Sequence, residues 1–412
     1  MKKILFLLGR YTPNYSANGI CCKNVINLLN EKGYKVSCIC NAYNENYISF
    51  KEGNTNIYPI KQRFYQRMEL LSNKIKNKKI GNFLKKISVF ISKIQLLVMT
   101  PFWPMVSPLY MNSFYKKALE LHKKERFDIV ISVYTPFESL YAGYKLKKKF
   151  PEIKFIPYYL DALAGGWGPS YLSPNIVDKK LMKKEKIISK AADLIISMDS
   201  SRKYHKKNGI DFNINRVFLD VPVMIKREVP SVIKEEFYAM YAGNLSYSGR
   251  SIIPLLEIFK IICNKTNLKL YLIGECNCVD KYNEYIEKTN GKIEFLGRKQ
   301  HKEVLKYEEK AKYLINIGST NPYTIPSKIF EYMSFNKTVI STYSIENEPS
   351  KEYLKKYKNV FFIDENLPYE ESANNFIEFM FFNGKNNIKK IDLEKVFYKN
   401  TPDAFEKTIR SI

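Results

Sequence analysis

The sequence predicts an α/β protein built from two Rossmann-like halves, and three observations support this. At 412 residues the chain exceeds one ordinary hydrophobic core, so two domains of roughly 200 residues each are expected. A hydrophobic content of 45% is ample for globular folding. Continuous apolar runs alternate with helical patterns along both halves, which is typical of parallel strands buried on both faces.

The first half opens with a strand, a loop, a helix and a second strand. An apolar run over residues 3–8 predicts the first strand, a polar loop reaches Gly19, and the following helix stops at Gly33. The loop lacks G-x-G-x-x-G, which disfavours a nicotinamide cofactor. Asn18 and Gly19 are candidates for a loop that approaches the acceptor or a phosphate, although a loop needing positive φ explains Gly19 equally well.

The same alternation continues to the end of the chain. Further strands are expected at residues 34–40, 127–133, 154–160, 192–198 and 216–221, and in the second half at 237–241, 268–273, 292–295, 312–317, 337–341 and 359–363. Helices are expected at residues 138–149, 178–190, 252–263 and 403–412. These elements predict domains at 1–222 and 236–390, with residues 391–412 crossing back to the first domain.

Asp161 follows the strand expected at residues 154–160. Ligands of doubly wound sheets bind at the carboxyl ends of the strands, so Asp161 could orient or deprotonate an acceptor hydroxyl. An Asp that caps its own loop in an Asx turn is the equal alternative.

Glycines stand at successive strand ends of the second half, where a ligand could lie against the backbone. They are Gly243, Gly274, Gly297 and Gly318. We expect Gly243, Asn244 and Gly274 to bind a donor, and Arg250 to clamp its diphosphate.

The stretch 321–340 runs from a loop through a short helix into a strand. Pro326 suits a first helical turn, so the amides of Ser327 and Lys328 are expected to point out of a positive helix end and to hold a phosphate. Glu331, about one turn further in, could accept hydrogen bonds from ribose hydroxyls. An amphipathic helix with a solvated Glu331 is the alternative.

Residues 61–93 carry ten Lys or Arg and one acidic residue, Glu69. Apolar residues recur there at helical spacing: Ile80, Phe83, Leu84, Ile87, Phe90, Ile91 and Ile94. A basic amphipathic helix suits docking onto an anionic membrane through residues 61–110, and packing on its own domain is the alternative. A membrane span over residues 94–115 is disfavoured because Pro101, Pro104 and Pro108 interrupt it.

Composition narrows the partners and the compartment. The net charge of +26 favours an anionic partner, but the basic residues lack the aromatic platform or reader motif of a nucleic-acid-binding protein. Seven cysteines without a regular framework favour reduced thiols in a cytoplasm. Cys276 and Cys278 lack a second ligand pair, so no metal is expected, and none of the three histidines follows a strand end, which disfavours a catalytic histidine.

The sequence resembles the retaining glycosyltransferases of the GT-B fold, specifically glycosyltransferase family 4, of the glycosyl transferases group 1 type. The resemblance covers nearly the whole chain. It is carried by the N-terminal strand and Asn18-Gly19 loop, Ala-Asp-Leu-Ile-Ile-Ser at 192–197, Tyr-Ala-Gly-Asn-Leu at 241–245, Leu-Ile-Gly at 272–274, Phe-Leu-Gly at 295–297 and above all Pro-Ser-Lys-Ile-Phe-Glu-Tyr-Met-Ser at 326–334.

The resemblance implies two Rossmann-like domains facing across a cleft, a nucleotide-sugar donor held by the C-terminal domain, and no metal or cofactor. Glu331 matches the second Glu of the family's Glu-x7-Glu motif, which contacts the donor ribose, and Tyr323 replaces the first, which contacts the sugar. Arg250 and Lys328 match the cations beside the donor phosphates, and Asp161 matches the acceptor-side His or Asp.

The expected function is that of a cytoplasmic hexosyltransferase, peripheral on the inner face of the plasma membrane. It would transfer sugar from a UDP- or GDP-type donor to a lipid-linked acceptor of surface polysaccharide, capsule or lipopolysaccharide. A non-catalytic GT-B scaffold and a sugar-nucleotide epimerase of the same fold are the alternatives. The sequence does not specify the donor base, the sugar, the acceptor, the linkage or the oligomeric state.

Overall fold

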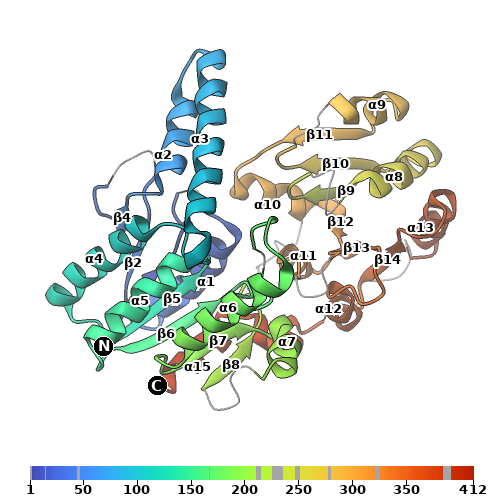
Figure 1. The fold of residues 1–412 in the computed structure, drawn as a ribbon. Helices are drawn as coiled ribbons and strands as arrows, with labels where there is room; N and C mark the ends of the chain where they lie inside the picture. The colour runs from blue at the N-terminus through green and yellow to red at the C-terminus, as the bar shows by residue number, and fades with distance from the viewer. Residues whose placement is uncertain are drawn as a thin grey trace. The chain divides into compact units, whose positions relative to one another are not determined.

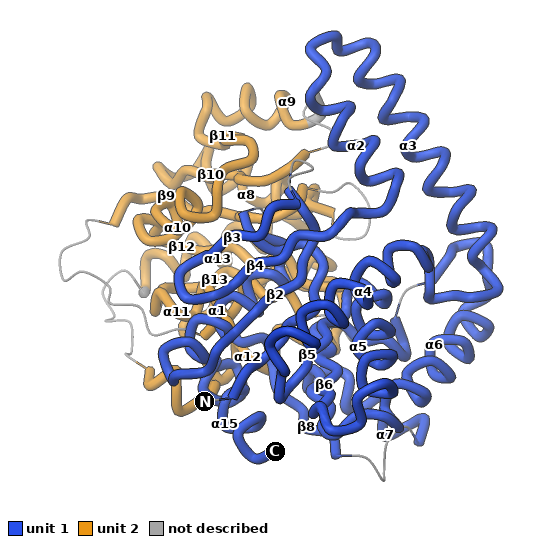
Figure 2. Tube along the Cα trace, turned by 90° about the vertical axis from the view of Figure 1, so that its left-hand side faces the viewer, with its two compact units in different colours: residues 1–222, 399–412 blue, residues 223–398 orange. Residues whose placement is uncertain are grey.

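The computed structural model describes residues 2–412 except 14, 44–46, 167, 210–214, 225–234, 246–250, 277–279, 321–324 and 384–390. The chain folds into two compact units (Figure 2). Unit 1 comprises residues 1–222 and 399–412, and unit 2 comprises residues 223–398.

Unit 1 is built on a sheet with strand order β3-β4-β2-β1-β5-β6-β7-β8 (Figure 1). Its strands are β1 (Lys3–Leu7), β2 (Lys35–Asn41), β3 (Phe50–Glu52), β4 (Thr55–Ile60), β5 (Ile129–Tyr134), β6 (Lys154–Tyr159), β7 (Ile195–Met198) and β8 (Arg216–Leu219). Neighbouring strands pair in parallel, except that β3 runs antiparallel to β4 at one edge. The order reverses between β1 and β5, which is the topological switch point of this sheet.

Helices cover both faces of this sheet because its central strands are apolar on both sides. Unit 1 contains helices α1 (Ala17–Glu31), α2 (Phe64–Lys74), α3 (Lys78–Met99), α4 (Pro108–Glu125), α5 (Phe137–Lys149), α6 (Pro174–Ser189), α7 (Arg202–Lys207) and α15 (Pro402–Arg410), of which the α2–α3 pair packs mainly on itself. Phe114 of α4, Leu140 of α5 and Leu181 of α6 share one core with the strands. On the other face, α1 packs with α15, and the Phe405 ring lies 4.8 Å from that of Tyr158.

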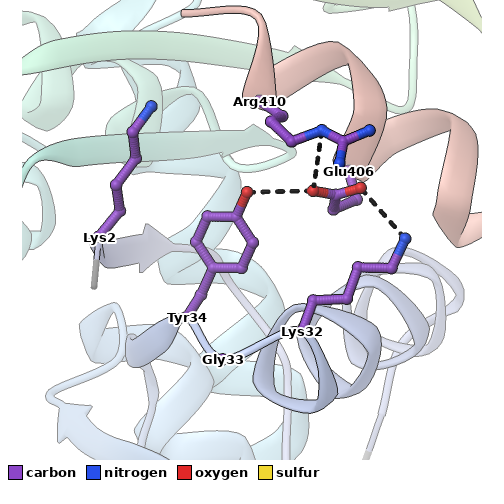
Figure 3. A pocket seen from close by; sticks show the side chains of 6 residues that line it. All are labelled: Lys2, Lys32, Gly33, Tyr34, Glu406 and Arg410. Atoms are coloured by element: carbon purple, nitrogen blue, oxygen red, sulfur yellow. Dashed lines mark hydrogen bonds and ion pairs between the residues drawn. The ribbon is translucent and has the colours of Figure 1, made fainter.

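The C-terminal helix α15 is attached to unit 1 by a buried carboxylate. Glu406 accepts hydrogen bonds from the Tyr34 hydroxyl at 3.0 Å and the Lys32 ammonium at 3.1 Å, and Arg410 lies 3.7 Å away (Figure 3). These residues line a pocket of about 430 Å³ together with Lys2 and Gly33.

Unit 2 is built on a parallel sheet with strand order β11-β10-β9-β12-β13-β14. Its strands are β9 (Glu236–Ala242), β10 (Lys269–Ile273), β11 (Ile293–Gly297), β12 (Ala311–Ile317), β13 (Thr338–Tyr343) and β14 (Val360–Asp364). In order of appearance this is 3-2-1-4-5-6, the order of dinucleotide-binding sheets, with its switch point between β9 and β12. Residues of α8 (Ile253–Lys265), α9 (Asp280–Lys288) and α13 (Tyr369–Asn383) form the core on one face of the sheet.

The other face of the second sheet carries the shorter helices. They are α10 (His301–Lys310), α11 (Lys328–Ser334) and α12 (Ser350–Tyr357), which pack against β9, β12, β13 and β14. A short α14 (Leu393–Val396) follows α13 in the chain. The predicted α/β class and the two Rossmann-like sheets are therefore confirmed.

The basic insertion differs from its prediction as one amphipathic helix. Asn77 caps a second helix, accepting bonds from the amides of Lys79 and Ile80, so α2 and α3 form an antiparallel hairpin (Figures 1 and 2). The predicted apolar stripe lies on one helix, α3. Only Leu84, Ile87 and Ile91 of the stripe are half-buried and its other residues are exposed, so the stripe does not pack as a whole on its own domain. Within the described ranges, no helix combines the length and apolar character needed to cross a bilayer.

Candidate active site

The carboxyl ends of the unit 2 strands bring the predicted glycines into contact. The Gly243 amide donates to the Ile273 carbonyl at 2.9 Å, and the Gly274 amide donates to the Gly297 carbonyl at 3.1 Å. A Cβ added at Gly274 would lie 1.8 Å from the Gly243 carbonyl oxygen, so only glycine fits there. Three neighbouring strand ends thus form one edge of bare backbone, with the exposed Asn244 directly after it.

Helix α11 lies beside this edge and carries Glu331. The Tyr332 hydroxyl accepts a hydrogen bond from the Ala242 amide at 3.2 Å, which ties the helix to the end of β9. The helix begins at Lys328, two residues after the Pro326 expected to open it, with turn bonds from Ile329 to Pro326 at 3.2 Å and from Phe330 to Ser327 at 3.3 Å. The expected phosphate site at the Ser327 and Lys328 amides stays a prediction.

Glu331 is buried, with 6% of its surface exposed, so the reading of a solvated Glu on an amphipathic helix is wrong. One carboxylate oxygen contacts the Lys328 ammonium, and the other accepts a hydrogen bond from His301 Nε2 at 2.9 Å. Burial alone would raise the pKa of Glu331, but the Lys328 ammonium and the His301 hydrogen bond lower it well below its usual range. The carboxylate is therefore ionised, and its orientation is fixed from two sides.

A second carboxylate, Glu308 of α10, contacts the same lysine. Its Oε1 lies 2.8 Å from Lys328 Nζ, and its side chain has no exposed surface. Burial raises the pKa of Glu308 to about 8, although Lys328 acts in the opposite direction. Burial would lower the pKa of Lys328, but the two carboxylates raise it. The ammonium predicted to face donor phosphates is thus bound to Glu308 and Glu331 in this structure.

His301 is the residue of this cluster that sequence reasoning missed. It begins α10, four positions after the end of β11, and its side chain is 38% exposed. The expectation that a catalytic histidine is disfavoured relied on none of the histidines directly following a strand. The signal available in the sequence was the strand end at Gly297, which only three residues separate from His301.

In unit 1, the structure brings together Asn18 and Asp161. Asn18 Nδ2 donates to Asp161 Oδ2 at 2.8 Å and approaches the Tyr134 carbonyl at 3.4 Å, so the end of β5 and the loop after β6 meet the start of α1. This is the switch point of the first sheet. Desolvation raises the pKa of Asp161 above its ordinary value, and the Asn18 hydrogen bond partly lowers it.

Carboxylates of α6 hold the loop that follows Asp161. Glu185 Oε2 accepts from the Ala164 amide at 2.8 Å, and Asp178 Oδ1 accepts from the Gly165 amide at 3.1 Å. Glu185 is itself bonded to His205 at 2.7 Å and Arg216 at 2.9 Å. The alternative that Asp161 only caps its own loop in an Asx turn is therefore disfavoured. Its carboxylate accepts a hydrogen bond from Asn18, and Glu185 and Asp178 hold the loop.

Gly19 has a structural reason of its own. It lies inside α1, where an added Cβ would be 2.6 Å from the Arg10 carbonyl oxygen. The alternative that its loop needs positive φ is wrong, because Gly19 is helical and the close approach involves the chain's own backbone.

Two predicted donor residues, Arg250 and Tyr323, lie outside the described residues. Among the residues that are described, no three His, Cys, Asp or Glu side chains are grouped so that they could hold a metal ion.

The fold is shared with solved glycosyltransferase structures. Sucrose-phosphate synthase from Thermosynechococcus elongatus is 13% identical with a TM-score of 0.61, covering 100% of this chain and 98% of that one. Alr3699/HepE of Anabaena, solved in complex with UDP, is 12% identical with a TM-score of 0.62 and full coverage of both chains. The apo lipopolysaccharide outer core galactosyltransferase WaaB is 13% identical with a TM-score of 0.55 and 99% coverage of both.

These similarities place the chain in the GT-B fold class. No protein-family model matches the sequence, and no curated protein matches it. At such low identities the likeness defines the fold, and the activity has to be argued from the site.

Proposed function

We propose that this protein is a retaining glycosyltransferase. It moves a hexose-type sugar from a UDP- or GDP-type donor to a lipid-linked acceptor in the biosynthesis of surface polysaccharide, capsule or lipopolysaccharide. The observation that carries the proposal is Glu331, a buried and ionised carboxylate held by Lys328 and His301 beside the switch point of the second sheet. An oriented carboxylate at such an edge suits the paired hydroxyls of a donor ribose.

The chemistry has to stabilise a leaving nucleoside diphosphate. Negative charge builds on that diphosphate as the sugar bond breaks, and fixed cations and backbone amides stabilise it. We assign this task to Arg250, to the amides near Ser327 and to the bare backbone at Gly243 and Gly274. Lys328 would join them only by leaving its two carboxylates.

Asp161 is the proposed acceptor-side group. Its raised pKa and its hydrogen bond from Asn18 suit a carboxylate that orients or deprotonates an acceptor hydroxyl. Retention of configuration and a front-face mechanism, in which the leaving phosphate helps to deprotonate the acceptor, rest on the resemblance to family 4. The same resemblance underlies our expectation that neither a metal nor a cofactor is needed.

The proposal extends to an acceptor at the inner face of the plasma membrane. Two proteins of similar fold support this direction: WaaB is a lipopolysaccharide outer core galactosyltransferase, and HepE was solved in complex with UDP. The basic hairpin of unit 1 supports it independently.

The decisive test is the thermal shift of the protein across nucleoside diphosphates, followed by turnover with the matching sugar donors. We expect one nucleotide to raise the melting temperature and its sugar donor to be consumed. Glu331→Ala should lose both effects, while Glu303→Ala, which removes an exposed carboxylate of α10, should keep both. Glu331→Gln keeps the shape of the side chain and tests the charge alone.

The other outcomes identify the alternatives. A scaffold would show no nucleotide-dependent shift and no turnover with any donor. An epimerase would convert the nucleotide-sugar into its epimer without releasing free nucleoside diphosphate during turnover. Either result would contradict glycosyl transfer.

A further inference from the structure

Helix α3 presents an apolar stripe to solvent. Ile80, Phe83, Phe90, Ile94 and Leu97 are each between 45% and 63% exposed. With the half-buried Ile87, they follow alternating spacings of three and four residues, which places them along one face of the helix. Soluble monomers rarely leave so continuous an apolar surface uncovered unless it binds something.

The stripe is left uncovered because α2 packs against a neighbouring face of α3, whose residues each follow a stripe residue by one position, about 100° around the helix. A Cβ added at Gly81 would lie 2.9 Å from the Ser72 carbonyl oxygen, and Ser88 Oγ donates to the Tyr65 carbonyl at 2.8 Å. Small residues thus let the two helices approach closely along that face, and the stripe stays outside their contact.

Charge identifies the partner. Lys79, Lys86 and Lys93 each precede a stripe residue by one position, about 100° around the helix, so they flank the stripe. Residues 78–99 contain five lysines and no acidic residue. A second copy paired through the heptad-like stripe would offer these lysines no acidic partner, because α3 contains none, whereas an anionic lipid surface supplies both an apolar interior and negative headgroups.

We propose that the outward face of α3 inserts into an anionic lipid bilayer, with Phe83 and Phe90 among the acyl chains and Lys79, Lys86 and Lys93 at the headgroups. The inference rests on the proposed function for its purpose, the delivery of a lipid-linked acceptor. The docking itself needs neither donor nor acceptor.

The hairpin is fixed at both ends to the body of unit 1. Glu138, which has no exposed surface, accepts from Arg63 Nη2 at 2.7 Å at the start of the hairpin and from the Ser107 amide at 2.9 Å after it. At the end of α3, Lys180 donates to the Thr100 carbonyl at 3.2 Å. A rigidly mounted hairpin would set the orientation of the Asn18–Asp161 pair relative to the bilayer, because Glu138 follows β5 at the same sheet edge.

The test is flotation of the full chain with vesicles of phosphatidylcholine alone and of phosphatidylcholine mixed with phosphatidylglycerol. We expect binding only to the mixed vesicles and weakening with salt. Phe83→Ser/Phe90→Ser should weaken binding at least about 100-fold, since two large apolar side chains lose their insertion. Lys86→Gln/Lys93→Gln should weaken it roughly 30-fold, about fivefold for each lysine.

The matched control is Lys78→Gln/Lys85→Gln, which removes the same charge from the helix side opposite the stripe and should weaken binding much less. All variants should keep the nucleotide-dependent thermal shift, so failure of docking and failure of the proposed function are separable. The proposal would be overturned if the two lysine double variants lost binding equally, or if the Phe83→Ser/Phe90→Ser variant still bound the mixed vesicles. It would also be overturned if sedimentation showed a dimer of the unmodified chain that becomes a monomer in the Phe83→Ser/Phe90→Ser variant.

Discussion

Glu308 is the residue whose ionisation should govern how stability depends on pH. Its pKa is raised to about 8 by burial from an ordinary value of 4.5. Between those values the unfolded carboxyl is ionised while the folded one keeps its proton, so unfolding releases a proton. The free energy of unfolding must therefore fall as pH rises through this window, by at most about 1.4 kcal/mol per pH unit.

Glu308→Gln should remove this dependence, because the amide has the shape of the protonated acid and does not ionise. We expect the variant to gain stability over the wild type as pH rises from 4.5 to about 8. Denaturant unfolding of unit 2 across this range measures it. Parallel pH curves for the two proteins would contradict the prediction.

Glu331 acts in the opposite sense at a different pH. Its pKa is lowered, so the stability it contributes is present above its ordinary value of 4.5 and is lost as pH falls below that value. The two acidic residues that contact Lys328 therefore differ in charge at neutral pH. Glu331 is ionised and can accept hydrogen bonds from a ligand, whereas Glu308 is protonated because it is buried.

At the scale of elements, α15 depends on one carboxylate more than on its other polar contacts. Lys32 contacts Glu406, which is 2% exposed (Figure 3). It also contacts Asp403 of the same helix, whose side chain is 55% exposed. The two carboxylates share a partner and differ in burial, which makes them a matched pair.

Glu406→Ala should lower the free energy of unfolding of unit 1 by roughly 2–3 kcal/mol, because it leaves the Tyr34 hydroxyl without its acceptor and opens space in a buried contact. Asp403→Ala should cost less than about 1 kcal/mol, as exposed ion pairs do. Chemical denaturation of both variants measures the difference. Equal costs would show that burial does not decide the contribution.

For the molecule as a whole, sequence reasoning succeeded where apolar patterning dominates. The central strands of both sheets are continuous apolar runs, and parallel order follows from the helices between them. It missed the β3–β4 edge, since Phe50 is 42% exposed and edge strands lack a two-sided apolar pattern.

The site was predictable in part for a similar reason. Glu331, Gly243 and Gly274 stand at positions that chain order assigns to one edge, and the structure brings them there. Glu308 could not be found this way, because its contact with Lys328 depends on how α10 lies against α11 across 20 residues of sequence. The strand end at Gly297 indicates that His301 lies near the edge, but its contact with Glu331, 30 residues away, also depends on that packing. Periodicity alone could not decide what the apolar residues of α3 contact, because it does not show which face of the helix α2 covers.

The path of the chain leads to a last prediction. Unit 1 is completed only by residues 399–412, after unit 2 has been made. These residues bury Phe405 and Ile409, at 1% and 0% exposure, against the first sheet. Two such side chains and the Glu406 contacts are worth roughly 5 kcal/mol, comparable with the whole stability of many domains.

A chain ending at Tyr398 should therefore lose the cooperative unfolding of unit 1 at ordinary temperature while unit 2 keeps its nucleotide-dependent thermal shift. A chain lacking only Ser411 and Ile412, which follow the buried part of α15, is the control and should behave as the full protein. Differential scanning calorimetry with and without nucleoside diphosphate separates the two transitions. If the shortened chain keeps both transitions unchanged, α15 is an accessory helix, and unit 1 is stable from residues 1–222 alone.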